Sequence, residues 1–207
     1  MIKNIDIFET APVPKAVFKF ALPTVLSMIV AVFYNMVDAF FVGQTGDPSQ
    51  FAAVNVATPI FMFLMAAGNI YGMGGSSFIS RALGEKNFTK VKNISSFCFF
   101  AGILTGILGG ALIIWQINPI LRAIGTTETT APFAHAYLSI VALGGPVIVI
   151  SNAFTNIIRG EGAAHNSMIG MMAGTIANII LDPIFILDKF LGIPCLGMGV
   201  QGAAIAT

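Results

Sequence analysis

The sequence predicts an all-α integral membrane protein, and three observations support that fold class. Hydrophobic residues make up 56% of the 207 residues and charged residues only 9%, whereas a soluble domain carries about 25% charged residues. Five apolar runs are each long enough to cross the ~30 Å hydrocarbon core of a bilayer. Inside these runs only two carboxylates occur, Asp38 and Asp182. We therefore expect five complete spans in one helical bundle.

The first two spans follow a polar lead of residues 1–15. The first span covers about 16–43, and Pro23 within it lacks a backbone N–H donor, so a bend is expected there. A turn leads to the second span at about 51–79, which is followed by a basic loop at 81–92.

The third and fourth spans contain glycines in positions that predict their packing. The third span, about 94–117, carries Gly102, Gly106 and Gly110 at four-residue intervals on one helix face, where a neighbouring helix can approach closely. The fourth span, about 133–158, is interrupted by Gly144, Gly145 and Pro146, so a second bend is expected.

The fifth span, about 168–187, carries the sequence Asn178-Ile-Ile-Leu-Asp182-Pro183. A glycine-rich link at 188–199 leads to residues 200–207, which are typical of the first turns of a sixth helix. We therefore expect residues 1–207 to form the front, N-terminal transmembrane lobe of something longer, with the sixth span truncated.

Basic residues predict the orientation in the membrane, because cytoplasmic loops carry an excess of Lys and Arg. With the N-terminus inside, eight basic residues fall on the cytosolic side and two on the outside. The cytosolic set is Lys3, Lys15, Lys19, Arg81, Lys86, Lys90, Lys92 and Arg159, and the outer set is Arg122 and Lys189. We expect a multi-pass protein of the cell membrane with a cytoplasmic N-terminus.

In this orientation several polar side chains share one depth in the outer half of the membrane. Asp38 and Asp182 each lie five residues before the outer end of their span, about 7–8 Å below the boundary. Tyr137 in the fourth span and Thr207 in the sixth fall close to the same level. Asn178 is one turn inward of Asp182 on the same helix face.

Asn35 is likewise one turn inward of Asp38. Oxygen ligands of this kind suit a hard cation such as Na⁺, and two neighbouring carboxylates in an apolar setting also suit a proton. A structural reading stands beside this interpretation for each residue. Asp182 could pair with a buried hydroxyl, Asp38 could reach the interface, Asn178 could form an interhelical hydrogen bond and Thr207 could bond to its own helix. Tyr137 could belong to the aromatic belt at the membrane surface.

Other classes of site receive no support from the sequence. Cys98 and Cys195 lie far apart without a CxxC spacing, and His135 and His165 fall at opposite ends of one span, so neither a structural metal centre nor a disulfide framework is indicated. The sequence shows no pairing of a nucleophile with a base, no phosphate-binding loop and no cofactor motif, so we expect no enzyme. The net charge of +1 argues against a nucleic acid partner.

The chain resembles the N-terminal half of the multidrug and toxic compound extrusion (MATE) transporters over nearly its whole length. The matching segments are 21–23, 37–43, 75–86, 159–162, 178–183 and 202–207. The resemblance implies a transporter of twelve helices in two six-helix lobes, with a central cavity that opens alternately to each side.

The resemblance also implies roles for individual residues, an activity and the partners of the chain. Asp38, Asn178, Asp182 and Thr207 would form a cation site, with Tyr137 in the adjoining polar network. The position of Asn35, one turn from Asp38, makes it a further candidate for that network. The activity implied is antiport, in which Na⁺ or H⁺ drives the export of organic, often cationic drugs or toxic metabolites. The C-terminal lobe of the same full-length chain and membrane lipids are the implied partners.

Two other functions remain open at this stage. A flippase for lipid-linked precursors within the same superfamily would need a more cationic cavity, whereas the five predicted spans contain no Arg or Lys except Lys19. A membrane scaffold subunit without transport activity would pair with its partner through the face of Gly102, Gly106 and Gly110.

Overall fold

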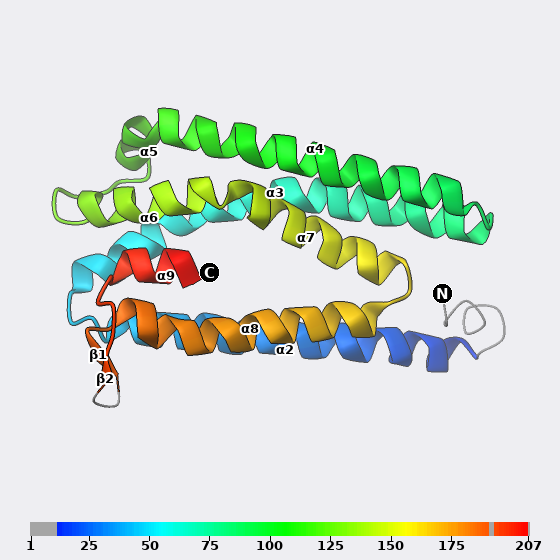
Figure 1. Ribbon diagram of the computed structural model, residues 1–207, viewed down its shortest axis with the longest axis horizontal. Helices are drawn as coiled ribbons and strands as arrows, with labels where there is room; N and C mark the ends of the chain where they lie inside the picture. The colour runs from blue at the N-terminus through cyan, green and yellow to red at the C-terminus, as the bar shows by residue number, and fades with distance from the viewer. Residues whose placement is uncertain (1–11, 191–192, 207) are drawn as a thin grey trace.

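The computed structural model describes residues 12–190 and 193–206, and eight helices and a two-stranded hairpin form this part of the chain. The helices are α2 (Val13–Gly43), α3 (Pro48–Gly84), α4 (Phe88–Trp115), α5 (Ile117–Ala123), α6 (Ala131–Leu143), α7 (Gly145–Gly160), α8 (Ala164–Ile186) and α9 (Val200–Ala206). The strands β1 (Lys189–Phe190) and β2 (Ile193–Pro194) pair antiparallel between α8 and α9. Figure 1 shows the long helices lying roughly parallel along one axis.

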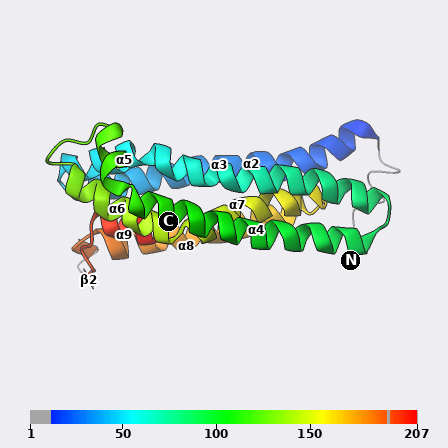
Figure 2. The ribbon, with the colours of Figure 1, turned by 90° about the horizontal axis from the view of Figure 1, so that it is seen from above.

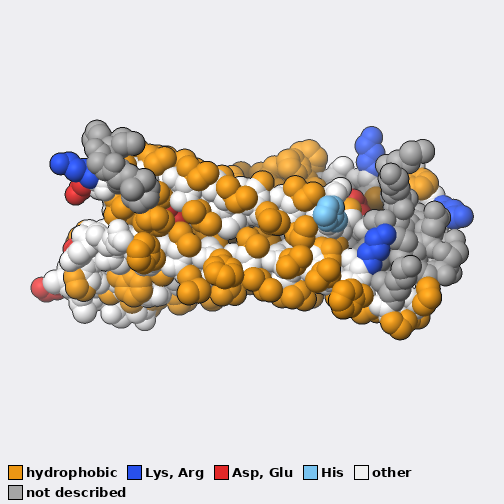
Figure 3. All heavy atoms as spheres, turned by 90° about the horizontal axis from the view of Figure 1, so that it is seen from below, with side chains coloured by type: hydrophobic (Ala, Val, Ile, Leu, Met, Phe, Trp, Pro, Cys, Tyr) orange, Lys and Arg blue, Asp and Glu red, His pale blue; other side chains and the backbone are white. Residues whose placement is uncertain are grey.

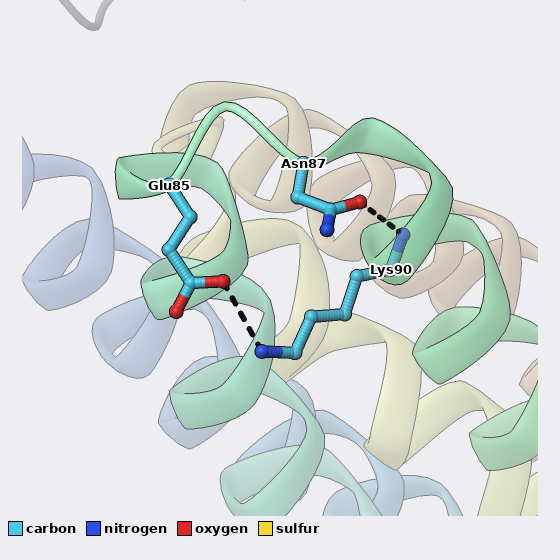
Figure 4. A network of polar contacts seen from close by, with 3 residues as sticks. All are labelled: Glu85, Asn87 and Lys90. Atoms are coloured by element: carbon cyan, nitrogen blue, oxygen red, sulfur yellow. Dashed lines mark hydrogen bonds and ion pairs between the residues drawn. The ribbon is translucent and has the colours of Figure 1, made fainter.

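Polar side chains at the helix starts determine where two of the long helices begin. Asp47 accepts a hydrogen bond from the backbone N–H of Ser49 at the start of α3, and Pro48 occupies the first helical position. Asn87 caps α4 by accepting from the backbone N–H of Lys90, 3.0 Å away. Figure 4 shows this cap beside the exposed ion pair of Lys90 with Glu85, 3.1 Å long. These caps satisfy backbone donors that have no acceptor within the helix.

The predicted bend in the fourth span is confirmed. Gly144 separates α6 from α7, and the two helices meet at an angle of 59°. Pro146 lies in the first turn of α7, where its missing N–H donor costs no intrahelical bond.

The segment between the third and fourth predicted spans contains a short helix, α5, whose Ile117 and Leu121 are buried in the core.

Glycines on α3 and α4 allow the neighbouring helices to approach until their backbones are in contact. A Cβ atom at Gly106 would lie 2.7 Å from the backbone nitrogen of Pro146, and one at Gly110 would collide with the carbonyl oxygen of Ala142. On α3, a Cβ atom at Gly68 would lie 2.7 Å from the carbonyl oxygen of Val149. The close approach predicted for the glycine face of α4 is thus made within the bundle, against α6 and α7. This face is therefore covered in the folded chain and is not available to a scaffold partner.

Amide side chains add hydrogen bonds to the interface between α3 and α7, as expected for polar residues between membrane helices. Asn156 donates to the side-chain oxygen of Asn69 over 3.0 Å, and Asn152 donates to the carbonyl oxygen of Met65 over 2.7 Å. Together with the glycine contacts, these bonds join α3, α4, α6 and α7 into one group.

A second group consists of α2 and α8, which lie side by side (Figures 1 and 2). The short helix α9 packs against both α6 and α8 and so bridges the two groups. Core side chains from both groups surround it. Val200 packs with the cluster that includes Leu138 and Tyr137, and Ala203 packs with Phe41 and Ile186.

The surface fits an apolar environment over most of its length. Helices α2, α3, α4 and α8 are each long and apolar enough to cross a membrane, and the bent pair α6–α7 qualifies as a fifth span. Figure 3 shows a broad band of hydrophobic side chains across one face, with most charged side chains towards the two ends. The predicted fold class, a membrane bundle of five complete spans and the start of a sixth, is confirmed.

Candidate functional site: a buried acidic cluster between α2, α6, α8 and α9

The C-terminal ends of α2 and α8 meet in a small apolar cluster that fixes their register. Phe41 and Val42 of α2 pack with Ile186 and Leu187 of α8 and with Ala203 of α9. On each of α2 and α8 the predicted carboxylate lies about one helical turn inward of these contacts, at Asp38 and Asp182. This packing brings the two acids together from positions 144 residues apart in the sequence (182 − 38).

Asp182 is enclosed completely, with an exposed fraction of 0%. Among the described residues, neither of its carboxylate oxygens has a hydrogen-bond partner, and the same holds for the buried Oδ1 atom of Asp38. The two carboxylates are close enough for their charges to interact. Two ionised acids placed in this way repel each other in a setting that solvates them poorly, so the arrangement favours the uptake of positive charge.

Asn178 joins Asp182 on the same face of α8 and is also buried. Its side-chain amide donates a hydrogen bond of 2.7 Å to the carbonyl oxygen of Ala206, at the end of α9. The interhelical bond considered from the sequence is therefore present. The Oδ1 atom of Asn178 is nevertheless buried and has no partner among the described residues, which leaves it available as a ligand.

Thr207, the remaining ligand that the resemblance implies, lies outside the described residues. Its neighbour Ala206 lies beside Asn178, as the hydrogen bond between them requires.

Tyr137 of α6 lies in the same region and is buried in the helix core rather than exposed in an interfacial belt. Its hydroxyl is close enough to interact electrostatically with Asp38 and with Tyr34. The sequence analysis did not assign Tyr34 a role. Its position four residues before Asp38 places the two side chains on one face of α2, and that spacing is the signal that would have identified it.

Asn35 has a different environment from the other predicted members. Its side chain is exposed on α2, whereas Asn178 and Asp182 are buried. The structure therefore brings together Asp38, Tyr137, Asn178 and Asp182 and leaves Asn35 on the surface of α2. Asn35 lies about 60° around the helix axis from Asp38, on the side opposite to Tyr34, and its side chain is exposed there.

The cluster offers oxygen atoms and no soft ligands. Four buried oxygens that have no partner in the described part of the chain come from Asp38, Asn178 and Asp182. Carboxylate and amide oxygens are the ligands that hard cations prefer. Within residues 12–190 and 193–206, no group of three or more His, Cys, Asp and Glu side chains could hold a metal ion. The arrangement suits a monovalent cation or a proton better than a transition metal.

Comparison with known proteins places the chain in a family. The family model MatE matches residues 23–184. The multidrug export protein MepA of Staphylococcus saprophyticus is 34% identical over 200 residues, which cover 97% of this chain and 43% of that protein. MepA of Staphylococcus aureus is 33% identical over the same shares of the two chains.

Solved structures agree with the sequence relatives. The crystal structure of a MATE protein in complex with MaD5 superimposes with a TM-score of 0.87 at 30% identity, over 99% of this chain and 44% of that one. This chain thus spans less than half the length of the relatives it matches. They are transport proteins and not enzymes, in agreement with the sequence prediction. The match of the family model over most of the chain shows that the protein belongs to the MatE family of membrane transporters.

Proposed function

We propose that the chain forms the N-terminal lobe of a cation-coupled antiporter that exports organic, often cationic compounds across the cell membrane. In this proposal Asp38, Asn178, Asp182 and Thr207 take up the coupling ion, Na⁺ or H⁺, and Tyr137 adjoins them. The observation that carries the proposal is the fully enclosed Asp182 carboxylate, which lacks a hydrogen-bond partner among the described residues and lies near a second acid.

Electrostatics supports a role for a cation in this cluster. A charged side chain deep in a membrane protein is costly unless it is paired, and intramembrane acids of this kind mark ion pathways and proton relays. No Arg or Lys occurs in the five predicted spans except Lys19, near the inner end of the first. A mobile cation is therefore the natural partner for these acids.

The exported compound is inferred from the relatives. Two of them are named multidrug export proteins, and we extend that activity to the protein that contains this chain. A second lobe, supplied by further sequence of the same full-length chain, would complete the cavity that binds the compound. The absence of basic residues in the spans supports cationic or neutral organic compounds over the anionic carrier of a lipid-linked precursor.

Coupling requires that the ion bind one conformation more tightly than another. In the proposed cycle, an outward-facing state takes up Na⁺ or H⁺ at Asp38 and Asp182 and loses their mutual repulsion. The neutralised cluster then permits α2 and α8 to repack, the organic compound leaves to the outside, and the ion is released inwards. A ligand with a hundredfold preference for one state shifts the equilibrium between the two states by about 2.7 kcal/mol.

The direct test is Asp182→Asn in the full chain, reconstituted in liposomes. We expect the substitution to abolish the stabilisation that Na⁺ or low pH gives to the wild-type protein, which amounts to about 2.7 kcal/mol at a concentration of 100 times Kd. Ion-driven export should be lost with it, because the site would no longer distinguish the two conformations.

Asp188→Asn provides the matched control, because it removes the same charge from an exposed position six residues further along the chain. This variant should keep both the ion-dependent stabilisation and the export. Retention of ion-dependent stabilisation and export in Asp182→Asn would contradict the proposal.

A further inference from the structure

The segment between β2 and α9 folds back onto the end of α8. The last four backbone carbonyl groups of a helix accept no hydrogen bond from within the helix. Here the backbone N–H groups of Leu196, Gly197, Met198 and Gly199 donate to the carbonyl oxygens of Ile184, Leu187, Phe185 and Ile186, respectively. Each bond is 2.9 to 3.1 Å long. The end of α8, the returning segment and α9 therefore form one hydrogen-bonded unit, which we call the α8–α9 unit.

The start of α9 lies directly on α8. A Cβ atom at Gly202 would collide with the backbone of Phe185, so only glycine allows this approach. Gly197 and Gly199 have φ angles of 60° and 55°, which L side chains rarely adopt. The path from α8 to α9 is thus fixed by backbone contacts and by glycine geometry.

One side chain of α3 is bonded to this unit. Gln50 lies in the first turn of α3, and its Oε1 atom accepts a hydrogen bond of 3.2 Å from the backbone N–H of Val200, the first residue of α9. The positions of the two residues differ by 150. The carboxamide also lies against Gly199, where an added Cβ atom would collide with it. Val200 is buried, so its N–H group depends on this acceptor.

Two cavities adjoin the bond. One, of about 240 Å³, is lined by Gln50, Phe133 and Val200 among others. The second, of about 130 Å³, is lined by Gln50, Thr45 and Asp188 among others. Gln50 lines both cavities, whereas the apolar contacts between α3 and α9 come from side chains such as Ala53 and Ala57, which pack in one cluster with Val200. The hydrogen bond of Gln50 is the specific link at this end of the helix.

The other end of α9 is bonded to the acidic cluster through Asn178 and the carbonyl oxygen of Ala206. A helix of seven residues is about 10 Å long, so a displacement at Val200 is transmitted to Ala206 and to Asn178. We propose that Gln50 is a positioning residue for the cation site, which it influences through α9 without contacting the ion. This inference rests on the proposed function.

The test uses the full chain and three variants. Gln50→Met keeps the length of the side chain and removes the acceptor. Gln50→Glu combined with Asp188→Asn keeps an acceptor and the net charge and avoids placing two carboxylates in one cavity. Gln201→Met makes the same chemical change as Gln50→Met at an exposed position of α9 and serves as the control.

Two measurements are made on each variant. Hydrogen–deuterium exchange follows the Val200 amide, and ion affinity is taken from thermal stabilisation in a Na⁺ titration at fixed pH and in a pH titration without Na⁺. For Gln50→Met we expect faster exchange at Val200 and ion binding weakened about two- to tenfold, the range for one lost hydrogen bond. The double variant should restore both values, and Gln201→Met should change neither.

Each result of these measurements either supports or overturns the role of Gln50. Unchanged exchange and affinity in Gln50→Met would overturn the inference, as would weakened affinity that the double variant does not restore. If Gln50→Met does not fold, Gln50→Asn replaces it. Its side chain is one methylene shorter, so the amide oxygen no longer reaches the N–H group of Val200, and the same results are expected. If no ion stabilises the wild-type protein, the proposed function fails, and the Gln50 inference, which rests on it, is overturned with it. If Asp182→Asn abolishes the ion effect while Gln50→Met leaves it unchanged, the proposed function stands and only the Gln50 inference fails.

Discussion

The carboxylate of Asp182 lies where an ionised group is least favourable, fully enclosed and near the second acid, Asp38. Burying an ion without a partner costs several kcal/mol even after the protein relaxes. Hydrogen bonds from neighbours would reduce this cost, but among the described residues neither oxygen of Asp182 receives one. The free energy therefore favours any state in which a cation or proton neutralises the cluster.

Tyr137 provides a test at the same scale. We expect Tyr137→Phe to weaken ion binding about two- to tenfold, because it removes a hydroxyl that lies near Asp38. The stability without ions should change little, since the ring keeps its place in the core. Thermal unfolding with and without Na⁺, at two pH values, measures both quantities.

Tyr71→Phe is the matched control for this variant. The hydroxyl of Tyr71 shares a hydrogen bond of 2.6 Å with Thr105 between α3 and α4, outside the acidic cluster. Its removal should lower the stability by about 1 kcal/mol and leave the ion affinity unchanged. Equal ion affinity in Tyr137→Phe and the wild-type protein would exclude Tyr137 from the site.

The sequence identified the acids because a carboxylate is conspicuous in an apolar run. It could not determine which way Asn35 points, because α2 is apolar on all sides, with exposed side chains such as Phe33, Met36 and Phe40. A helix without a polar face carries no periodicity from which burial can be inferred. Tyr34 was overlooked for the same reason. Only packing against other helices, mainly α8, separates the two faces.

At the scale of helices, glycine spacing predicted where close contacts form but not with which partner. The intervals between Gly102, Gly106 and Gly110 identified one face of α4, and the structure shows that Ala142, Gly145 and Pro146 occupy it. Helix α5 and the hairpin were not predicted, because elements this short show too few turns or alternations for a pattern. The bond from Gln50 to Val200 joins segments far apart in sequence, so no local signal announces it.

Gly110→Ala tests the glycine contact. The added Cβ atom would collide with the carbonyl oxygen of Ala142, a backbone atom that cannot rotate away. We expect the free energy of unfolding to fall by about 1–3 kcal/mol, the usual cost of overpacking. The unfolding midpoint in detergent measures the change.

Gly74→Ala makes the same substitution at an open position of α3, since no atom of the described residues lies within 4 Å of its Cβ position. Alanine is favoured over glycine in a helix interior, so this variant should be as stable as the wild-type protein or more stable by about 0.5–1 kcal/mol. Equal effects of the two substitutions would show that the contact with Ala142 does not limit the approach of α4 to α6.

For the whole molecule, the ends of the bundle differ in charge. The turns from α3 to α4 and from α7 to α8 lie at the end where α2 begins (Figure 1). The basic residues Arg81, Lys86, Lys92 and Arg159 lie in or next to these turns. Arg122 and Lys189 belong to the other end. The rule that cytoplasmic loops are positive therefore predicts that the first end faces the cytoplasm.

Labelling of single cysteines tests this orientation. In a Cys195→Ser background, where Cys98 is buried, we introduce Lys92→Cys at the first end or Lys189→Cys at the second. A maleimide that does not cross membranes should label Lys189→Cys on intact cells and label Lys92→Cys only after permeabilisation. The reverse pattern would invert the proposed topology and, with it, the side from which the ion enters.

Complete enclosure of the Asp182 carboxylate has a kinetic consequence. A bound ion or proton can leave only when the surrounding helices separate, and such collective motions take about microseconds to milliseconds. The dwell time at the carboxylate then follows the frequency of these openings and not the rate of diffusion in water. On the proposed function, export would then follow the ionic gradient averaged over many openings and would not respond to fluctuations shorter than one opening.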